Sequence, residues 1–471
     1  GVNGGVNYSE RGVYSNENTI TWKKILNKKN RFDVMGGFSL QSITGEGFGL
    51  SAQNLPNEQL GVWGLNEGIP RPNSSRYILS TMTSVFGRVN YSYDSKYLAT
   101  LTYRADGSSK FLKKWGYFPS AALAWRMSRE SFMKDIKFIS DAKLRASIGV
   151  TGNNRVGDFS YDPALGMPFD GSYSFNNATP IPGIRQTNMG NKDLKWEPTT
   201  QADLGIDLGF LKNKIELTVD VYRKTTSDLL LNANVPYVTG FSTAYKNIGK
   251  LQNEGLEITL QTINVKNKKF SWTSSFNISF NRNKILALTK DEQFMLSSVA
   301  FDNLYTDFPY IARVGESAAT FFGMIWEGVY GYEDFDVAPD GKYILKPGLP
   351  TNNPDVTIKP RPGDIKYRDV NSDGVINGND RVNIGRTAPI HTGGFSNTFA
   401  YKGIDLNVFL QWSYGNDILN VNKAFFEGNQ SSRILLNQFA SYQDRWTEEN
   451  TSSKIFRVNG GGPAGVYSTR L

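Results

Sequence analysis

Residues 369–380 have the types and the spacing of a loop that binds a divalent cation. They read Asp-Val-Asn-Ser-Asp-Gly-Val-Ile-Asn-Gly-Asn-Asp, with oxygen-bearing side chains at the first, third, fifth, ninth and twelfth positions. A hard cation such as Ca²⁺ takes about six to eight oxygen ligands, and Gly374 stands where such a loop turns sharply. The sequence predicts six ligands, the fourth through its backbone carbonyl: Asp369, Asn371, Asp373, Val375, Asn377 and Asp380.

This loop departs from the calcium-sensor pattern at its last ligand. Asp380 replaces the glutamate that usually binds through both oxygens, and the flanking sequence shows no evident helix pair. The loop therefore resembles the dockerin type more than a sensor EF-hand. The alternative is a turn rich in Asn, Asp and Gly that binds nothing. We expect structural Ca²⁺ rather than a switch.

The chain has few other groups of residues that could form a catalytic or metal-binding site. It has no cysteine, which excludes disulfides, thiolate metal sites and cysteine nucleophiles. Any Ser-His-Asp triad would need His391, the single histidine, which is predicted to be a polar loop residue before a strand. Asp203 and Asp207 have the residue types of glycosidase acids, but they fall on one wall of one predicted strand. The chain is therefore predicted not to be an enzyme.

The net charge of +8 and the pI near 9.2 invite a nucleic-acid interpretation. The basic residues, however, gather at predicted tight turns, as in Lys212 with Lys214 and in the run Lys266, Lys268 and Lys269. Charged turn tips are ordinarily solvated, so no nucleic-acid partner is predicted.

Period-two alternation dominates the chain and indicates β-strands. In residues 201–208, Ala202, Leu204, Ile206 and Leu208 occupy one face and polar residues or glycine the other. The same pattern recurs at 143–150, 215–222, 256–261, 270–280 and 404–412. Mean hydropathy is −0.40, and no run of about 18 apolar residues exists, which excludes a bundle of transmembrane helices. Alternating strands of a transmembrane barrel remain compatible with that composition.

Strand length and connection length favour a membrane barrel over a soluble sandwich. The alternating runs are about nine to eleven residues long, as a tilted strand needs to cross a bilayer. Turns near 95, 213, 268 and 403 are short, whereas the predicted connections 42–80, 151–199, 223–250 and 281–392 are long. Short turns on one side and long loops on the other are typical of outer-membrane barrels. Aromatic residues at the ends of apolar faces fit interfacial girdles: Tyr97, Tyr103, Tyr401 and Trp412.

The predicted architecture is an all-β, antiparallel transmembrane β-barrel segment with long extracellular loops. Roughly twelve strands can be counted, and an isolated sheet of that kind would leave two unpaired edges in lipid. We therefore expect the intact barrel to contain more strands, and both ends of the chain look cut. Four segments are predicted: strands and loops over 1–281, a long extracellular region with the calcium-like loop and one or two strands over 282–392, a hairpin over 393–414, and a loop with a helix over 415–471.

Several ordered motifs resemble the SusC/RagA family of TonB-dependent transporters. They include Arg-Ala-Asp-Gly-Ser-Ser at 104–109, Trp-Gly-Tyr-Phe-Pro-Ser at 115–120, the segment 191–197 ending in Leu-Lys-Trp-Glu, and Pro-Gly-Asp-Ile at 362–365. Tyr-Gly-Asn-Asp at 414–417 and Arg-Trp-Thr at 445–447 are similar to the family as well. The resemblance covers nearly the whole chain.

The resemblance implies a barrel of about 22 strands with an N-terminal plug, in the outer membrane of a Gram-negative, Bacteroidetes-type cell. It implies a SusD-like surface lipoprotein as a lid, energy supplied by the TonB complex, and paired two-protein complexes. The implied substrates are oligosaccharides or oligopeptides. Compared with that family, we expect the plug and the closing strands to lie outside this segment. Polar residues that face inward would line the substrate route: Arg88, Arg104, Arg145, Asp203, Asp207 and Glu216.

Two alternatives remain open at this point. A secreted calcium-binding β-sandwich adhesin would also show alternating strands and a dockerin-like loop, but it should have linkers between domains, and none is evident. An outer-membrane enzyme would need a converging catalytic cluster, which one histidine and no cysteine disfavour.

Overall fold

The computed structural model describes residues 2–57, 59–167, 172–174, 177, 179–289, 292–302, 305–351, 360–427 and 437–458. Within these ranges the chain forms two compact units. The first unit comprises residues 1–279, 286–289 and 395–410, and the second comprises 280–285, 290–394 and 411–471. None of the helices found in the described residues combines the length and the apolar character needed to cross a membrane.

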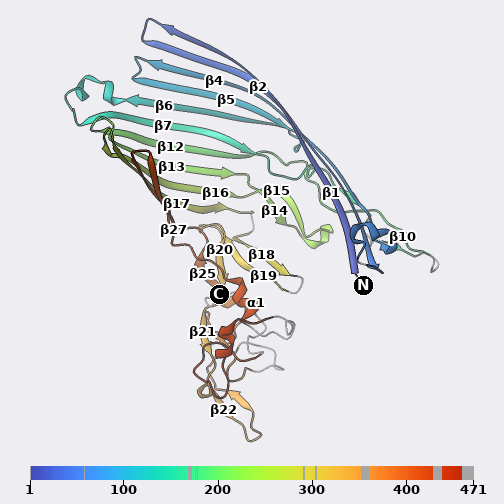
Figure 1. Ribbon diagram of the computed structural model, residues 1–471. Coiled ribbons are helices and arrows are strands. Elements are labelled where there is room, and N and C mark those ends of the chain that lie inside the picture. The colour runs from blue at the N-terminus through green and yellow to red at the C-terminus, as the bar shows by residue number, and fades with distance from the viewer. Residues whose placement is uncertain are drawn as a thin grey trace. The chain divides into compact units, whose positions relative to one another are not determined.

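One large sheet dominates the chain (Figure 1). Its path begins with β1 (Val2–Leu26), β2 (Asn30–Leu55), β4 (Ser74–Tyr93), β5 (Tyr97–Ser108), β6 (Trp115–Arg126) and β7 (Ile139–Asn153). It continues with β12 (Glu197–Phe210), β13 (Ile215–Ser227), β16 (Lys250–Lys266), β17 (Phe270–Ala287), β26 (His391–Tyr401) and β27 (Ile404–Tyr414). The short β3 (Ile69–Pro70) pairs beside β2. The twelve strands of the path agree with the number predicted from alternation, and the pairs from β1 to β16 are antiparallel.

The strands are longer than the sequence predicted. β1 has 25 residues, β2 has 26 and β4 has 20, against the nine to eleven expected. The predicted loop 42–80 is therefore wrong at both of its ends, because β2 continues to Leu55 and β4 begins at Ser74. Strand pairing continues past the length that crosses a bilayer, since backbone hydrogen bonds do not require an apolar side chain on either face.

Alternation along each strand and register between strands produce one continuous apolar face. Val89 pairs with Leu101, Leu101 with Ala121, and Ala121 with Ile148. Directly paired residues point to the same side of a sheet, so these side chains form a row across four strands. A parallel row runs through Tyr91, Ala99, Leu123, Ala146, Leu204, Val221 and Leu256. We call the side that carries these two rows the apolar face.

Side chains of the apolar face remain exposed to a degree unusual for soluble proteins. Leu101 is 61% exposed, Leu123 64% and Ile148 55%. A large contiguous exposed apolar surface indicates contact with another apolar phase. Aromatic contacts gather near the short turns of the sheet, among them Tyr93–Tyr97, Trp125–Phe132 and Phe138–Phe210. This position fits the interfacial girdle that Tyr97 was predicted to join.

The turns that join β4 to β5 and β6 to β7 are tied together through Glu130. Its carboxylate accepts hydrogen bonds from the Tyr97 hydroxyl at 2.8 Å, the Trp125 indole at 3.2 Å and the Lys96 ammonium at 3.2 Å. These hydrogen bonds lower the pKa of Glu130, with the Tyr97 contact contributing most. The short-turn end of the sheet is thereby held by specific polar contacts as well as by strand pairing.

The long connections at the opposite ends of the strands are packed against one another. Phe111, Phe118, Val156, Leu194 and Trp196 are buried together. They come from β6 and from the connections 109–114 and 154–196. The Trp196 indole donates a hydrogen bond to the Lys114 carbonyl at 2.8 Å, which joins the two connections. We call these five residues the loop core, and it packs described parts of the two connections against each other.

The second unit contains more strands than the one or two predicted for 282–392. They are β18 (Phe294–Asp302), β19 (Tyr305–Arg313), β20 (Thr320–Gly323), β21 (Trp326–Val329), β22 (Phe335–Val337), β23 (Tyr343–Leu345), β24 (Ile365–Tyr367) and β25 (Val382–Arg386). Met324, Ile365, Tyr367, Ile376 and Phe456 form its core. Six of these eight strands have five residues or fewer, which is shorter than the alternating runs from which strands were predicted.

The helix predicted within 415–471 is present only in part. The structure contains the six-residue α1 (Val421–Phe426) and a 3-10 turn over Ala440–Asp444. Ile434 and Leu435, two apolar residues of the segment in which the helix was predicted, lie outside the described residues. Tyr442 and Trp446 are buried, so their spacing reflects packing of an irregular segment rather than a helix face.

Candidate functional site: the polar face of the sheet

The side of the large sheet opposite the apolar face carries all six residues predicted to line a lumen. Arg88 pairs with Thr102, Thr102 with Ser120, and Ser120 with Gly149. Gly149 pairs in turn with Gln201, and Gln201 with Lys224. Residues two apart on a strand share a face. The register therefore puts these six on one side, which we call the polar face: Arg88, Arg104, Arg145, Asp203, Asp207 and Glu216.

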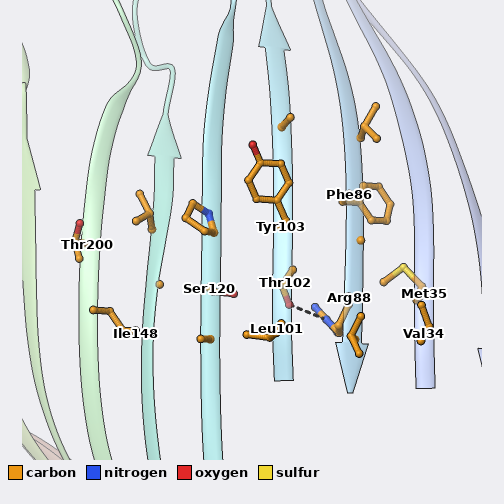
Figure 2. A pocket seen from close by; sticks show the side chains of 18 residues that line it. Val34, Met35, Phe86, Arg88, Leu101, Thr102, Tyr103, Ser120, Ile148 and Thr200 are labelled. Carbon is orange, nitrogen blue, oxygen red and sulfur yellow. Dashed lines mark hydrogen bonds between the residues drawn. The ribbon is translucent and has the colours of Figure 1, made fainter. Parts of the chain in front are cut away.

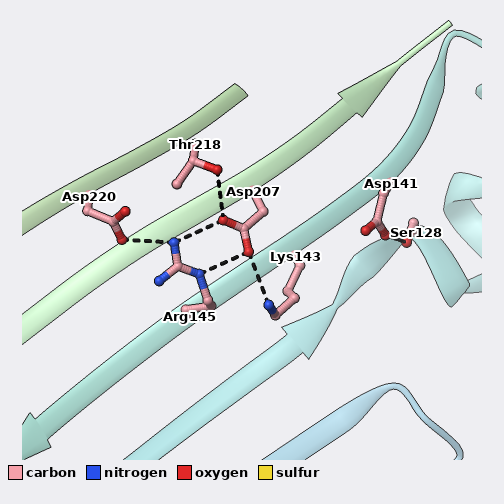
Figure 3. A network of polar contacts seen from close by, with 7 residues as sticks. All are labelled: Ser128, Asp141, Lys143, Arg145, Asp207, Thr218 and Asp220. Atoms are coloured by element: carbon pink, nitrogen blue, oxygen red, sulfur yellow. Dashed lines mark hydrogen bonds and ion pairs between the residues drawn. The ribbon is translucent and has the colours of Figure 1, made fainter. Parts of the chain in front are cut away.

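Arg145 is the centre of a charge network that joins three strands (Figure 3). Its guanidinium donates two parallel hydrogen bonds to the Asp207 carboxylate, both at 2.9 Å, and lies 2.9 Å from Asp220. Lys143 donates to Asp207 at 3.1 Å, and the Thr218 hydroxyl donates to it at 3.3 Å. Bidentate contact between arginine and a carboxylate is among the stronger polar interactions in proteins. The network locks β7, β12 and β13 together.

Gly205 makes room for this arginine. A Cβ built at Gly205 would lie 2.8 Å from Arg145 Nη2 and would also collide with the Asp220 carboxylate. Gly205 pairs with Arg145 on one side and with Asp220 on the other. Only a residue without a side chain lets the guanidinium lie across β12 and reach both aspartates.

The other predicted residues lie outside this network. Arg88 donates to the Thr102 hydroxyl at 3.3 Å, and Arg104 donates to Asp106 at 2.7 Å and to Ser84 at 2.8 Å. Asp203 makes no ion pair with any residue that the structure describes. Glu216 pairs with Gly209 and Gln261 along the sheet. The structure thus brings Arg145 and Asp207 into direct contact and leaves Arg88, Arg104 and Glu216 apart from them.

Two members of the network, Lys143 and Asp220, were not singled out from the sequence. Both lie on the polar side of the alternating patterns at 143–150 and 215–222. What alternation does not provide is the register, which places Asp220 opposite Gly205 and Lys143 opposite Asp207. The network holds its acids in pairs with cations and contains no histidine or cysteine. The network can stabilise a hydrated polar face, and its charges can attract polar solutes.

A hollow of about 780 Å³ lies over the first strands of the sheet (Figure 2). Most of its lining comes from the apolar face, including Val89, Leu101, Ala121 and Ile148. Gly87, Ala105 and Ala121 contribute little volume, which explains the depression. Because the hollow is apolar and belongs mainly to this face, we do not assign a polar substrate to it.

The predicted calcium loop is closed by its own hydrogen bonds in this structure. The Asp369 carboxylate accepts from the backbone amide of Gly374 at 2.8 Å, and Asp380 accepts from the amides of Val370 at 2.9 Å and Asn377 at 2.8 Å. Asp380 is fully buried. Among the residues that the structure describes, no three acidic or histidine side chains converge as a metal would require. Calcium binding by this loop stays a prediction.

His391 lies at the start of β26 rather than in a loop, and its surroundings are aromatic. Its Nδ1 accepts a hydrogen bond from the Trp412 indole at 3.1 Å, and its ring stacks on Tyr414 at 5.1 Å between centroids. Phe280 lies 5.5 Å away. The histidine is therefore a packing residue at a strand end, with no serine–acid pair described beside it.

Comparison with protein families gives a match over residues 1–462 to the family described as TonB dependent receptor-like, beta-barrel. TonB-dependent receptor P3 of Formosa agariphila is 33% identical over 462 residues, which are 97% of this chain and 44% of that protein. TonB-dependent receptor SusC of Bacteroides thetaiotaomicron is 36% identical over 273 residues, which are 55% of this chain and 26% of that protein. The chain thus spans less than half the length of these curated relatives.

Among solved structures, the RagAB peptide transporter has a similar fold. The TM-score is 0.75 at 21% identity, and the match covers 98% of this chain and 47% of that one. At this identity the likeness establishes the fold alone. It confirms the predicted all-β, antiparallel architecture of a TonB-dependent receptor barrel.

Proposed function

Because this chain belongs to the TonB-dependent receptor-like β-barrel family, we propose that it forms part of the barrel wall and the extracellular loops of a SusC/RagA-type nutrient importer. The family is located in the outer membrane and is not enzymatic, in agreement with the sequence analysis. Membership also removes the β-sandwich adhesin and the outer-membrane enzyme as alternatives. The importer would take up its substrate with energy from the TonB complex.

The two-faced sheet is the observation that carries this proposal. An outward apolar face suits lipid, and an inward polar face suits a hydrated passage. Leu123 and Ile148 belong to the first face, whereas Arg88, Asp203 and the Arg145 network belong to the second. In the proposed importer the polar face lines the route of the substrate once the plug moves.

A surface lipoprotein of the SusD type is proposed as a lid over the long loops. Several large apolar side chains of these loops are strongly exposed and lie outside the strands of the large sheet: Trp63 at 89%, Leu165 at 72%, Tyr237 at 85% and Val238 at 95%. A lid that covered these side chains would remove their apolar surface from water. Importer and lid would assemble as a pair of two-protein complexes.

The proposed substrate is an oligosaccharide or an oligopeptide. A barrel of this size encloses a passage wider than that of a small porin, and exposed loop tyrosines such as Tyr173 and Tyr237 offer flat surfaces for contact. We also propose that the loop 369–380 binds Ca²⁺ as a structural clip, on the strength of its ligand pattern.

Charge reversal on the polar face tests the proposal. Arg88→Glu and Asp203→Lys, made in the full-length protein, should change uptake while leaving the barrel folded, because neither residue belongs to the Arg145 network. Lys268→Glu at a short turn is the control. Uptake is measured as TonB-dependent growth on the substrate, and folding as the heat-dependent mobility shift of the barrel. Unchanged uptake in both variants would count against a passage along this face.

A further inference from the structure

A second hollow, of about 510 Å³, opens among the long loops of the first unit. Its wall is formed by residues 189–195 of the β7–β12 connection and by residues 244–248, which include most of β15 (Thr243–Asn247). Lys113 joins from the β5–β6 connection. The hollow lies at the long-loop end of the sheet, where an incoming solute would arrive first in the proposed importer.

The two walls of this hollow are clipped together by side-chain amides. Asn247 accepts from the Lys195 amide at 2.9 Å and donates to the Lys195 carbonyl at 2.8 Å. Asn191 donates to the Tyr245 carbonyl at 2.8 Å. Ala244, next to Tyr245 in sequence, is buried. The geometry of the hollow is therefore set before any ligand arrives, which reduces the entropy lost on binding.

The charge of the hollow is positive. Lys113, Lys195 and Lys246 line it, and Asp193 is its one lining acid among the described residues. Lys113 and Asp193 are 3.5 Å apart, but their side chains are 72% and 89% exposed, so this pair is weak. Lys195 pairs with Asp228 at 2.7 Å, and Asp228 does not line the hollow. Lys246 has no ion-pair partner within the described part of the chain.

Three backbone amides around the hollow donate hydrogen bonds within the loops, so they are not offered to a ligand. The amides of Asn191 and Leu194 donate to Ser160 and Asn191, and that of Ile248 donates to Leu229. An extended peptide binds best where unpaired backbone groups can add it as a strand. The side chains that line the hollow include the three ammonium groups and Tyr245, which is 40% exposed. This combination suits a ring-shaped, negatively charged ligand.

We propose that this lysine hollow binds an anionic substituent, carboxylate or sulfate, on an oligosaccharide. The proposal rests on the proposed import function and names the substrate class. The ammonium groups of Lys113, Lys195 and Lys246 attract the anion, and the Tyr245 ring packs against the face of a sugar ring. The hollow concentrates charged saccharides at the loops before they enter the barrel.

Binding to the full-length transporter in detergent tests this directly by titration calorimetry. The probes are an oligogalacturonate, a sulfated galactan oligosaccharide, neutral maltohexaose and hexaglutamate. We expect the uronate or the sulfated probe to bind at least about tenfold more tightly than maltohexaose, with affinity that falls as salt rises. The two anionic sugars distinguish carboxylate from sulfate.

The lysine variants then locate the site. Lys195→Gln with Lys246→Gln should weaken binding of the anionic sugar about tenfold or more, whereas the turn variant Lys268→Gln should not. An unchanged thermal melting temperature shows that the double variant is folded. Equal binding by wild type and double variant, tighter binding of hexaglutamate, or no preference over maltohexaose would each overturn the proposal. If cells that carry the wild-type transporter showed no TonB-dependent growth on the substrate, that result would instead contradict the import function itself.

Discussion

Arg145 shows how ion pairs can fix a charged side chain in one position on the face of a sheet. Its guanidinium is matched by two carboxylates, and each carboxylate comes from a different strand. Gly205 provides the space that brings all three groups together. Because Gly205 on the middle strand has no side chain, the guanidinium can contact the carboxylates of both β12 and β13.

Gly205→Ala should therefore destabilise the barrel. The new methyl group would displace Arg145 from Asp207 and Asp220, and overpacking of this kind costs about 1–3 kcal/mol. Urea unfolding of the detergent-solubilised protein, followed by tryptophan fluorescence, measures the change. Gly87→Ala is the control, because a Cβ there meets its nearest atom at 3.6 Å. Equal stability of the two variants would show that the guanidinium can relocate at no cost.

The calcium prediction belongs to the same scale. An extracellular clip with a dissociation constant of about 10⁻⁴–10⁻³ M should gain roughly 1.4–2.7 kcal/mol of stability in 10 mM Ca²⁺. We expect Ca²⁺ to raise the melting temperature of the full-length protein and EDTA to reverse the rise. Asp369→Asn should abolish the response. Its amide oxygen can still accept from Gly374, so the turn should survive. No response in the wild type would mean that the loop is held by its own hydrogen bonds.

At the scale of elements, alternation predicts the strands well and their ends poorly. The apolar positions of 201–208 and 215–222 predict β12 and β13, and Lys212 marks the turn between them. The pairing of β2 with β4 past Thr44 was not predicted, because residues such as Gly45 and Gly47 give no alternation to follow. In this part of β2 the strand is maintained by backbone hydrogen bonds to the neighbouring strands, and these pairings cannot be read from the sequence.

The loop core is the element-level feature that sequence reasoning missed, since its residues lie far apart in the chain and show no period. Phe111→Ala should loosen it, because removal of a fully buried phenylalanine costs about 3–5 kcal/mol. We expect rapid proteolytic cleavage within 154–196 while the barrel keeps its heat-dependent mobility shift. Leu112→Ala is the matched control, since Leu112 is 54% exposed. Equal cleavage of both variants would indicate that the loops are ordered by other contacts.

At the scale of the whole molecule, the apolar and polar faces exist because the strands are paired in one register, and no single strand defines them. Asp203 lies on the polar face only because β12 pairs with β7 through Ser147. A shift of one residue would send Asp203 into lipid and Leu204 into the passage. The candidate site could therefore be predicted residue by residue from alternation, whereas the contacts within it required the paired sheet.

Adjacent residues of β7 test this separation of faces most sharply. Ile148 lies on the apolar face, and an arginine there should destabilise the inserted barrel, because an arginine on the lipid face costs from about 0–1 kcal/mol at the interface to about 2–4 kcal/mol at the bilayer midplane. Ser147 lies on the polar face opposite Asp203, which has no described ion-pair partner. Ser147→Arg should therefore be tolerated. Folding into lipid vesicles, followed by urea titration, compares the two variants. If Ile148→Arg folded as well as Ser147→Arg, the apolar face would not be in contact with lipid. The assignment of the polar face to a hydrated passage would then be wrong as well.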